Sequence, residues 1–409
     1  MTLNQEYKKV LLVGYNGANN TGSEARLLSI IKDIQELLDP NVLITIPTLN
    51  EKNLRRYIKE SPNIKIQAIS SIFHLALTRL VKKNDLILLV EGSCYMDTWS
   101  SALLNAFLWT TKYAYKYNKP CIAYAVDAGH LSPSNKKKVK KEASKTSLII
   151  TRTYKAAEIL SSIGVTAPIK VTADCAFRFN CEKEDEQILD KIWPSDDGFV
   201  GLAVVDFHLW PVKMRLWGKR EYCYKWPYYF SRSPENKKAS NILAYRWAVQ
   251  ADEIIEEQGK KIALICMEDV DIPLARLVLE KMRNKEQARI FSSSQYNASQ
   301  MTGILQNLDL LITSRYHAGV LSLKKAVPQI AVGHDTRLRT FYNELGIYEK
   351  YFIDYKEPDA WRNIKEISDE LIEKPDNLKN ILEKGFFNHL ERAGENPLLL
   401  EKFIKARDL

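Results

Sequence analysis

Residues 309–319 read DLLITSRYHAG, an apolar run followed by Ser314, Arg315, Tyr316 and His317 and then by small residues. This order predicts a buried strand, a tight crest and a helix. In open α/β sheets, ligands bind beyond the carboxyl ends of the strands, where free N–H groups of the next helix favour an anion. Arg315 can hold a carboxylate or phosphate through two parallel hydrogen bonds, and His317 can transfer a proton near neutral pH. We take both as candidate site residues, with a surface arginine and a core histidine as the alternative.

The same rhythm of strand and helix extends over most of the chain. Strand-like apolar runs occur at 8–14, 41–47, 63–69, 85–90, 120–126, 147–151 and 169–172, and again at 199–206, 261–267, 288–291, 309–313 and 329–332. Helical stretches separate them, which predicts an α/β fold with parallel sheets covered on both faces.

A charged segment at 182–197 interrupts this rhythm and marks a domain boundary. A chain of 409 residues is long enough for two hydrophobic cores. We therefore expect two Rossmann-like, doubly wound domains, 1–181 and 198–357, that face each other across a cleft. The remaining residues, 358–409, are expected to form a helical C-terminal tail that packs partly onto the body.

The composition indicates a soluble protein without a structural metal. Six cysteines are scattered without a C-x-x-C pair, which fits a reduced compartment and predicts no metal site. The polar N-terminus does not resemble a signal peptide, and the apolar runs are shorter than the roughly 20 residues that span a bilayer. We expect a cytoplasmic protein whose membrane contact, if any, is peripheral and on the inner face.

The net charge is +9, and part of the excess lies in the lysine-rich run at 136–141. This run reads as a solvated helix face, and no nucleic-acid-binding signature accompanies it, so nucleic acid is not expected as a partner. The basic balance suits an anionic substrate or an anionic membrane surface.

A Gly- and Asn-rich turn follows the first strand, at 14–24. Such a turn lets the backbone approach a ligand closely and offers helix N–H groups to an anion, although a plain tight turn explains it equally well. Asn20, Gly22 and Ser23 of this turn, together with Gly92 and Ser93 after the strand at 85–90, end parallel strands. We expect all of them to face the same cleft as Arg315.

The segment 207–232 mixes aromatic and basic residues and has neither helical nor strand periodicity. Such a mixture suits stacking on sugar faces, binding of phosphates or contact with lipid headgroups. A loop folded over its own small aromatic core remains the alternative. We expect the segment to border the cleft and to contact the acceptor through Trp217 and Trp226.

Taken in order, these stretches resemble the polysaccharide pyruvyl transferase family. Asn20-Thr21-Gly22-Ser23-Glu24 matches the family's N-x-G-D-E pattern, with Ser23 in place of Asp. The later matching stretches are Val90-Glu91-Gly92-Ser93 with Asp97, Ala125-Val126-Asp127-Ala128-Gly129, Arg152, Ala173-Asp174 and the S-R-x-H-A element from Ser314. The resemblance covers roughly residues 8–350, and its specificity lies in the order of the motifs.

The resemblance implies a GT-B-like architecture and a donor in the interdomain cleft. It implies transfer of the pyruvyl group of phosphoenolpyruvate to a sugar of a cell-surface polysaccharide or lipid-linked saccharide, forming a cyclic ketal. Phosphoenolpyruvate would be a co-substrate, with no further cofactor. Protonation of the methylene carbon needs an acid, here His317, and phosphate release needs an anion clamp, here Arg315. The other expected donor-site residues are Asn20, Gly22, Ser23, Gly92, Ser93 and Ser314.

One departure concerns the donor. The family often carries an Arg just after the first strand of the second domain, where this chain has Asp206-Phe207-His208. Donor binding would differ there, or the donor would be another compound.

Two other functions stay open. A sugar-nucleotide glycosyltransferase would have the same architecture, but the glutamate pair eight residues apart that often marks retaining enzymes is matched only by Glu349 and Glu357, in a stretch that reads as strand and turn. A non-enzymatic binder of glycan or nucleic acid would keep its binding after loss of Arg315 and His317.

Overall fold

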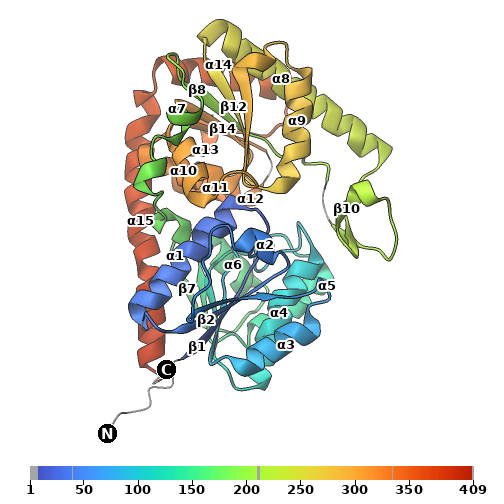
Figure 1. Ribbon diagram of the computed structural model, residues 1–409, viewed down its shortest axis with the longest axis vertical. Helices are drawn as coiled ribbons and strands as arrows, with labels where there is room; N and C mark the ends of the chain where they lie inside the picture. Colours follow the sequence, from blue (N-terminus) through green and yellow to red (C-terminus); the bar gives the residue numbers. More distant parts are fainter. Residues whose placement is uncertain (1–7, 39, 210–211, 334, 408–409) are drawn as a thin grey trace.

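The computed structural model describes residues 8–38, 40–209, 212–333 and 335–407. Two open parallel sheets with helices on both faces are stacked one above the other in Figure 1. The expected α/β fold with two Rossmann-like domains and a helical C-terminal region is confirmed.

The first domain contains a seven-stranded parallel sheet whose strand order places β1 in its interior. In sheet order the strands are β3 (Ile64–Ala68), β2 (Leu43–Thr48), β1 (Lys9–Val13), β4 (Leu86–Leu89), β5 (Cys121–Val126), β6 (Leu148–Thr151) and β7 (Ile169–Val171). The order reverses between β1 and β4, which is the switch point where doubly wound sheets bind ligands.

Both faces of this sheet are buried, which is why its strands read as continuous apolar runs. Val10 and Leu12 of β1 face α1 (Thr21–Leu37) and α2 (Glu51–Leu54). Leu11 and Val13 face the opposite layer. That layer consists of α3 (His74–Lys83), α4 (Ser101–Lys116), α5 (Pro133–Ala143) and α6 (Tyr154–Ser162).

The second domain repeats the topology with a six-stranded parallel sheet. Its strands, in sheet order, are β13 (Ala288–Ser292), β12 (Lys261–Cys266), β8 (Phe199–Ala203), β14 (Leu310–Thr313), β15 (Gln329–Val332) and β16 (Phe352–Ile353). Its helices are α8 (Pro234–Gln258), α9 (Ile272–Lys281), α10 (Ala298–Gln306), α11 (Tyr316–Ser322), α12 (Thr336–Glu344) and α13 (Tyr348–Tyr351), with the short α7 (Ile188–Ile192) in the preceding linker. The switch point here lies between β8 and β14, next to Arg315.

The segment 207–232 carries a small antiparallel sheet of its own. Its strands are β9 (Lys213–Met214), β10 (Cys223–Lys225) and β11 (Tyr228–Tyr229), in the order β10-β11-β9. The sheet projects from the second domain and lies beside the first one, at the right edge of Figure 1.

The C-terminal residues are more than a tail. After α14 (Ala360–Glu373), the long α15 (Asp376–Lys405) runs along the left edge of both domains in Figure 1. Leu382 packs in the core of the second domain and Leu400 in that of the first. This helix therefore ties the two domains together.

The stretch 348–358 contains the expected strand and turn, as β16 and the residues after it, but residues 348–351 form the short helix α13 instead of a strand. No helix in the described part of the chain is both long and apolar enough to cross a membrane.

Candidate active site

A cavity of about 490 Å³ lies where the carboxyl edges of the two parallel sheets meet. Several polar groups that line it follow strands: Tyr15 and Asn20 follow β1, Glu91 follows β4, Glu268 follows β12, and Arg315 follows β14. A volume of this size is typical of small-molecule sites. Both domains therefore contribute to one chamber, as the topology predicts.

The turn after β1 is held in place by its own polar residues. Asn20 caps α1, since its side chain accepts a hydrogen bond from Ser23 N at 3.1 Å. Gly17 has a positive φ of 73°, and a side chain there would lie 2.6 Å from Thr48 Oγ1. The turn thus needs glycine both for its backbone conformation and for the close approach of β2.

The same turn is bonded to the second domain. Thr21 N donates to Met267 O at 2.9 Å, and Asn20 Nδ2 donates to Glu268 Oε2 at 3.1 Å. Tyr15 donates its hydroxyl hydrogen to Glu268 Oε1 at 3.1 Å. Glu268 is therefore held mainly by groups of the first domain, across the cavity.

Arg315 precedes the first residue of α11 and is already paired with two carboxylates. Its Nε donates to Asp271 Oδ2 at 2.9 Å, its Nη2 donates to Asp271 Oδ1, and its Nη1 donates to Glu268 Oε2 at 3.2 Å. Burial raises the pKa of Asp271 to about 6, although Arg315 counteracts the effect. The guanidinium still has one N–H on each terminal nitrogen for a ligand in the cavity.

His317 lies against α1 of the other domain. A Cβ on Gly22 would be 2.0 Å from His317 Nδ1, so the imidazole occupies the place that any side chain at Gly22 would take. Its Nε2 lies 3.4 Å from Asp174 Oδ2 but makes no hydrogen bond. Burial lowers the pKa of His317, and the nearby Arg152 adds to the effect against the attraction of Asp174. The imidazole is therefore neutral at pH 7.

A buried ionic network lies below His317. Asp174 accepts hydrogen bonds from Arg26 at 2.6 Å and from Arg152 at 2.5 Å, and the Arg152 Nε donates to Asp127 at 2.9 Å. Burial opposes ionisation of Asp174, but the two arginines prevail and lower its pKa well below the usual range. Arg152, which matches the family's pattern, thus belongs to the ionic network beneath the site and does not line the cavity.

Two carboxyl groups line the cavity, Glu91 from the first domain and Glu268 from the second. Glu91 Oε2 accepts hydrogen bonds from Ser23 Oγ at 3.2 Å and Tyr15 N at 3.3 Å, and its Oε1 accepts one from Ser93 N at 3.3 Å. The pKa of Glu268 is raised by burial, with a contribution from the charge of Glu91, against the attraction of Arg315. A carboxyl with a raised pKa is suited to donate a proton near neutral pH.

The cavity also has an apolar end. Phe73 and Leu77 line it from α3 and the residue before it, and Leu103 and Phe107 line it from α4. We call these residues the apolar end of the lining and the polar residues described above its ionic end.

The sequence-predicted residues divide into three groups. Asn20, Ser23, Ser93, Arg315 and His317 line the cavity, as expected of residues at the ends of parallel strands. Gly22 and Gly92 do not line it, but they make room for His317 and Arg152, respectively. Ser314 is buried and does not line it either.

The two predicted acceptor-binding tryptophans are placed at the surface. Trp217 is 80% and Trp226 is 53% exposed, and neither lines the cavity. Tyr224, Lys225 and Tyr228 of the same segment do line it. The segment borders the cavity as expected, but through residues of its small sheet such as Tyr224 and Tyr228, whereas both tryptophans lie outside the strands of that sheet.

Sequence reasoning missed Glu91, Glu268, Asp271 and Arg337. Glu91 lies within a stretch that matches the family, and Glu268 follows the run at 261–267, so position at a strand end was a usable signal. No sequence pattern marks Asp271 as a site residue, because only the fold brings it next to Arg315. Arg337 lines the cavity from α12, where it pairs with Asp335 and lies 5.0 Å from the ring centre of Trp99.

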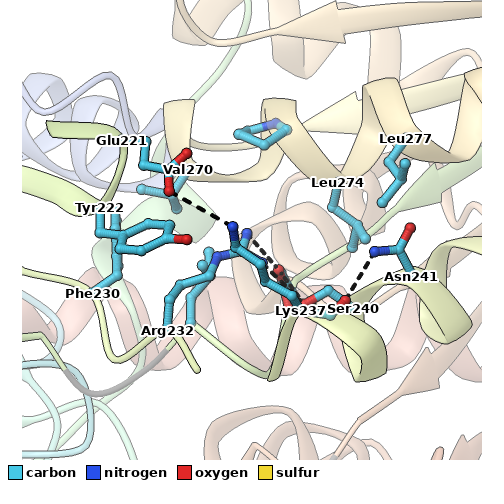
Figure 2. Close-up of a pocket in the computed structure, with 13 residues that line it drawn as sticks. Glu221, Tyr222, Phe230, Arg232, Lys237, Ser240, Asn241, Val270, Leu274 and Leu277 are labelled. Atoms are coloured by element: carbon cyan, nitrogen blue, oxygen red, sulfur yellow. Dashed lines mark hydrogen bonds and ion pairs between the residues drawn. The ribbon is translucent and has the colours of Figure 1, made fainter. Parts of the chain in front are cut away.

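A smaller cavity of about 320 Å³ lies beside the first one, between segment 207–232 and the starts of α8 and α9 (Figure 2). Its two cations are paired: Arg232 with Asp206 at 3.3 Å, and Lys237 with Glu221 at 3.7 Å. An arginine therefore does reach the end of β8, where related chains often carry one, but Asp206 holds it. None of the candidate site residues lines this cavity within the described chain.

In the part of the chain that the structure describes, no group of three or more His, Cys, Asp or Glu side chains is arranged to hold a metal ion.

Comparison with known proteins places the chain in context. The family model described as polysaccharide pyruvyl transferase matches residues 20–336. No curated protein sequence matches the chain.

Several solved structures have the same fold. HepE from Anabaena in complex with UDP and glucose is 12% identical, with a TM-score of 0.61 and coverage of 98% of this chain and 100% of that one. MnaA from S. aureus, solved with UDP, is 11% identical, with a TM-score of 0.63 and coverage of 98% and 97%. A UDP-GlcNAc 2-epimerase from Methanocaldococcus jannaschii is 14% identical, with a TM-score of 0.60 and coverage of 93% and 97%. The likeness establishes a fold of the GT-B type.

Proposed function

The chain belongs to the polysaccharide pyruvyl transferase family, and from this premise we propose that it transfers the pyruvyl group of phosphoenolpyruvate to a saccharide in the cavity between its domains. The product is a cyclic pyruvate ketal, and phosphate is released. The observation that carries the proposal is the meeting of Arg315, His317 and Glu268 in one interdomain cavity.

The donor is a small trianion, and the ionic end of the cavity supplies cations for it. Arg315 and Arg337 enter from the second domain, and each is held in orientation by an aspartate, the buried Asp271 or the partly exposed Asp335. A preoriented guanidinium binds a carboxylate or phosphate with little loss of side-chain freedom. We assign Arg315 to the donor phosphate or carboxylate.

The reaction needs one group that gives a proton and one that takes a proton. Protonation of the donor's methylene carbon forms a cationic centre at C2, which the acceptor hydroxyl attacks while losing its own proton. A second hydroxyl of the acceptor then displaces phosphate and closes the ketal.

The lowered pKa of His317 revises the role expected from the sequence. A neutral imidazole is ready to take a proton, so we assign it to the acceptor hydroxyl. Glu268, whose pKa is raised by burial, is assigned to donate the proton to the methylene carbon. His317 thus remains a proton-transfer residue, with the direction of its first transfer reversed.

The acceptor is a saccharide of a cell-surface polysaccharide, carried on a lipid. The apolar end of the cavity, lined by residues such as Phe73 and Phe107, supports a lipid-linked form, because a free glycan gives such a wall little to bind. The enzyme would then act in the cytoplasm, at the inner face of the membrane.

A sugar-nucleotide transferase is the second candidate. It is favoured by the overall fold shared with structures solved with UDP. Thermal shifts separate the two, because a true donor stabilises the folded state by mass action. We expect phosphoenolpyruvate to raise the melting temperature and UDP or UDP-glucose to leave it unchanged; the reverse pattern would select the second candidate.

Turnover is tested by mass spectrometry. The purified protein is incubated with ¹³C-labelled phosphoenolpyruvate and lipid-linked saccharides extracted from producing cells. We expect a labelled pyruvyl mass gain on the glycan, with release of phosphate, and no gain with the His317→Asn variant. Label that stays in phosphoenolpyruvate would contradict the proposal.

A further inference from the structure

The tip of segment 207–232 carries large apolar side chains that nothing in the described structure covers. Residues 213–220 are all exposed. Met214 is 65%, Leu216 is 63% and Trp217 is 80% exposed. Monomeric proteins seldom expose such residues next to one another without a partner, so this tip requires a function.

A second exposed apolar group lies beside this tip. Ser71 Oγ donates to Trp226 O at 2.7 Å, which joins the loop before α3 to the small sheet. Ile72 and Leu75, at the start of α3, are 58% and 73% exposed. We call Ile72, Leu75, Met214, Leu216, Trp217 and Trp226 the apolar patch; it is built from both domains.

The patch continues into the apolar end of the active-site cavity. Phe73 and Leu77 line that end, while Ile72 and Leu75 alternate with them along the chain and face solvent. One turn of α3 therefore has its inner face in the cavity and its outer face in the patch. A chain of methylene groups bound in the cavity would emerge at this place.

The charges of residues 213–220 are of one sign, and the first acidic residue after them is Glu221. Residues 213–220 contain Lys213, Arg215, Lys219 and Arg220 and no acidic residue. All four of these cations are exposed. Cations around exposed tryptophan and leucine are the combination that binds an anionic bilayer, where the rings enter the headgroup region and the charges remain at its surface.

We propose that the apolar patch docks on an anionic lipid bilayer and brings the cavity to its lipid-linked acceptor. This inference rests on the proposed function for the acceptor, but the docking itself is measured without turnover. The saccharide would reach the ionic end at Arg315 while its lipid remains at the apolar end.

Vesicle flotation tests the docking directly. The full chain is mixed with vesicles of neutral phosphatidylcholine, or of the same lipid with about 30% phosphatidylglycerol, at low and high salt. We expect binding to the anionic vesicles only, weaker at high salt because the cations are screened. The affinity of the double variant Leu216→Ser/Trp217→Ser for anionic vesicles should be lower by about tenfold or more, since two inserted apolar side chains are lost.

Matched variants give the controls. Phe387 and Leu398 are 65% and 52% exposed on α15, at the opposite edge of the molecule. The double variant Phe387→Ser/Leu398→Ser should bind vesicles like the wild type. Replacing Lys137 and Lys138 of α5 by Glu removes exposed cations that are not part of the apolar segment 213–220, and should change binding less than the Leu216/Trp217 variant does.

Three results would overturn the docking proposal. The first is a wild-type protein that does not bind anionic vesicles. The second is a Leu216/Trp217 variant that binds them as strongly as the wild type. A dimer in light scattering that the same variant converts to a monomer would assign the patch to a second copy of the chain. The stabilisation by phosphoenolpyruvate is measured on each variant, so a failure of the donor proposal is seen separately.

Discussion

At the scale of single residues, the site depends on how Arg315 is held. Asp271 fixes the plane of the guanidinium through two hydrogen bonds, and Glu268 binds a third N–H. The arginine is thus both the proposed donor clamp and the partner of a proposed catalytic acid. Replacement of Arg315 therefore acts on both roles.

Arg315→Lys is predicted to weaken phosphoenolpyruvate binding about tenfold or more. Lysine keeps the charge but cannot present two parallel N–H groups, and it leaves Asp271 with an incomplete partner. Calorimetric titration measures the effect. Arg289→Lys is the control, since Arg289 donates to Ile192 O at 2.9 Å, lies over the ring of Phe291 and does not line the cavity, so its loss should leave donor affinity unchanged.

His317→Asn is predicted to reduce kcat by about 10²- to 10⁴-fold, the scale of general acid–base catalysis. Because burial lowers the pKa of His317, the wild-type kcat should fall as the pH drops through a value below 6.5. The variant should lose that limb of the pH profile. A variant that keeps the limb would exclude His317 as the titrating group.

His389 provides the matched control for a structural histidine. It is buried in α15, with Nε2 3.1 Å from Glu344 and Nδ1 2.8 Å from Gly385 O. His389→Asn should lower the melting temperature and leave the kcat of the folded enzyme near normal. The two histidine variants thus separate catalysis from stability.

At this scale the sequence predicted residue types better than roles. Arg315 and His317 were found because they end a strand, and the chemistry of an arginine and a histidine is largely intrinsic. Their directions of action depend on neighbours such as Asp271 and Asp174, which are 44 and 143 residues distant in the chain. No local pattern contains such pairings.

At the scale of elements, the packing of α11 against α1 decides where His317 points. Gly22 lies in the first turn of α1, and the absence of a side chain there leaves the space that the His317 imidazole occupies. The glycine in the family's opening motif is therefore needed for an interdomain contact.

Gly22→Ala is predicted to reduce turnover at least about tenfold with a small change in melting temperature. The added methyl would lie 2.0 Å from Nδ1, so the imidazole must move. Gly394→Ala on α15 is the control, because nothing lies within 4 Å of its added Cβ. That change should raise helix stability by up to about 1 kcal/mol and leave turnover intact. Equal turnover in both variants would contradict the assignment.

The strands of the two parallel sheets were predictable, since strands buried on both faces read as continuous apolar runs. The small sheet of segment 207–232 was not. Its strands have two or three residues, too few to show an alternation. For the same reason Trp217 and Trp226 were expected at the cleft, whereas Tyr224 and Tyr228 line it.

At the scale of the whole molecule, the site exists only while the domains are closed. Residues of the first domain hold Glu268 of the second, and α15 packs on both cores. Glu24 of α1 lies in this interface, and neither of its carboxylate oxygens makes a hydrogen bond. Burial raises its pKa to about 8, against the attraction of Arg56.

Glu24→Gln is predicted to stabilise the protein increasingly as the pH rises. Between pH 4.5 and about 8 the folded state keeps the Glu24 proton and the unfolded state does not, so wild-type stability falls with rising pH in this window. The effect is at most about 1.4 kcal/mol per pH unit. Denaturant unfolding at pH 5 and pH 8 measures the difference between wild type and variant.

Glu36→Gln is the control for that experiment. Glu36 lies on the same helix with its side chain 54% exposed, so its replacement should have the same small effect at both pH values. A gain from Glu24→Gln that is equal at pH 5 and pH 8 would contradict a protonated Glu24 in the interface.

The central claim is that the cavity between the domains binds phosphoenolpyruvate through Arg315. Isothermal titration of the wild type and of Arg315→Lys with phosphoenolpyruvate, and of both with UDP-glucose, tests it most directly. The account predicts saturable binding of phosphoenolpyruvate that the variant weakens about tenfold or more, and no binding of UDP-glucose. Saturable binding of UDP-glucose, with none of phosphoenolpyruvate, would contradict it.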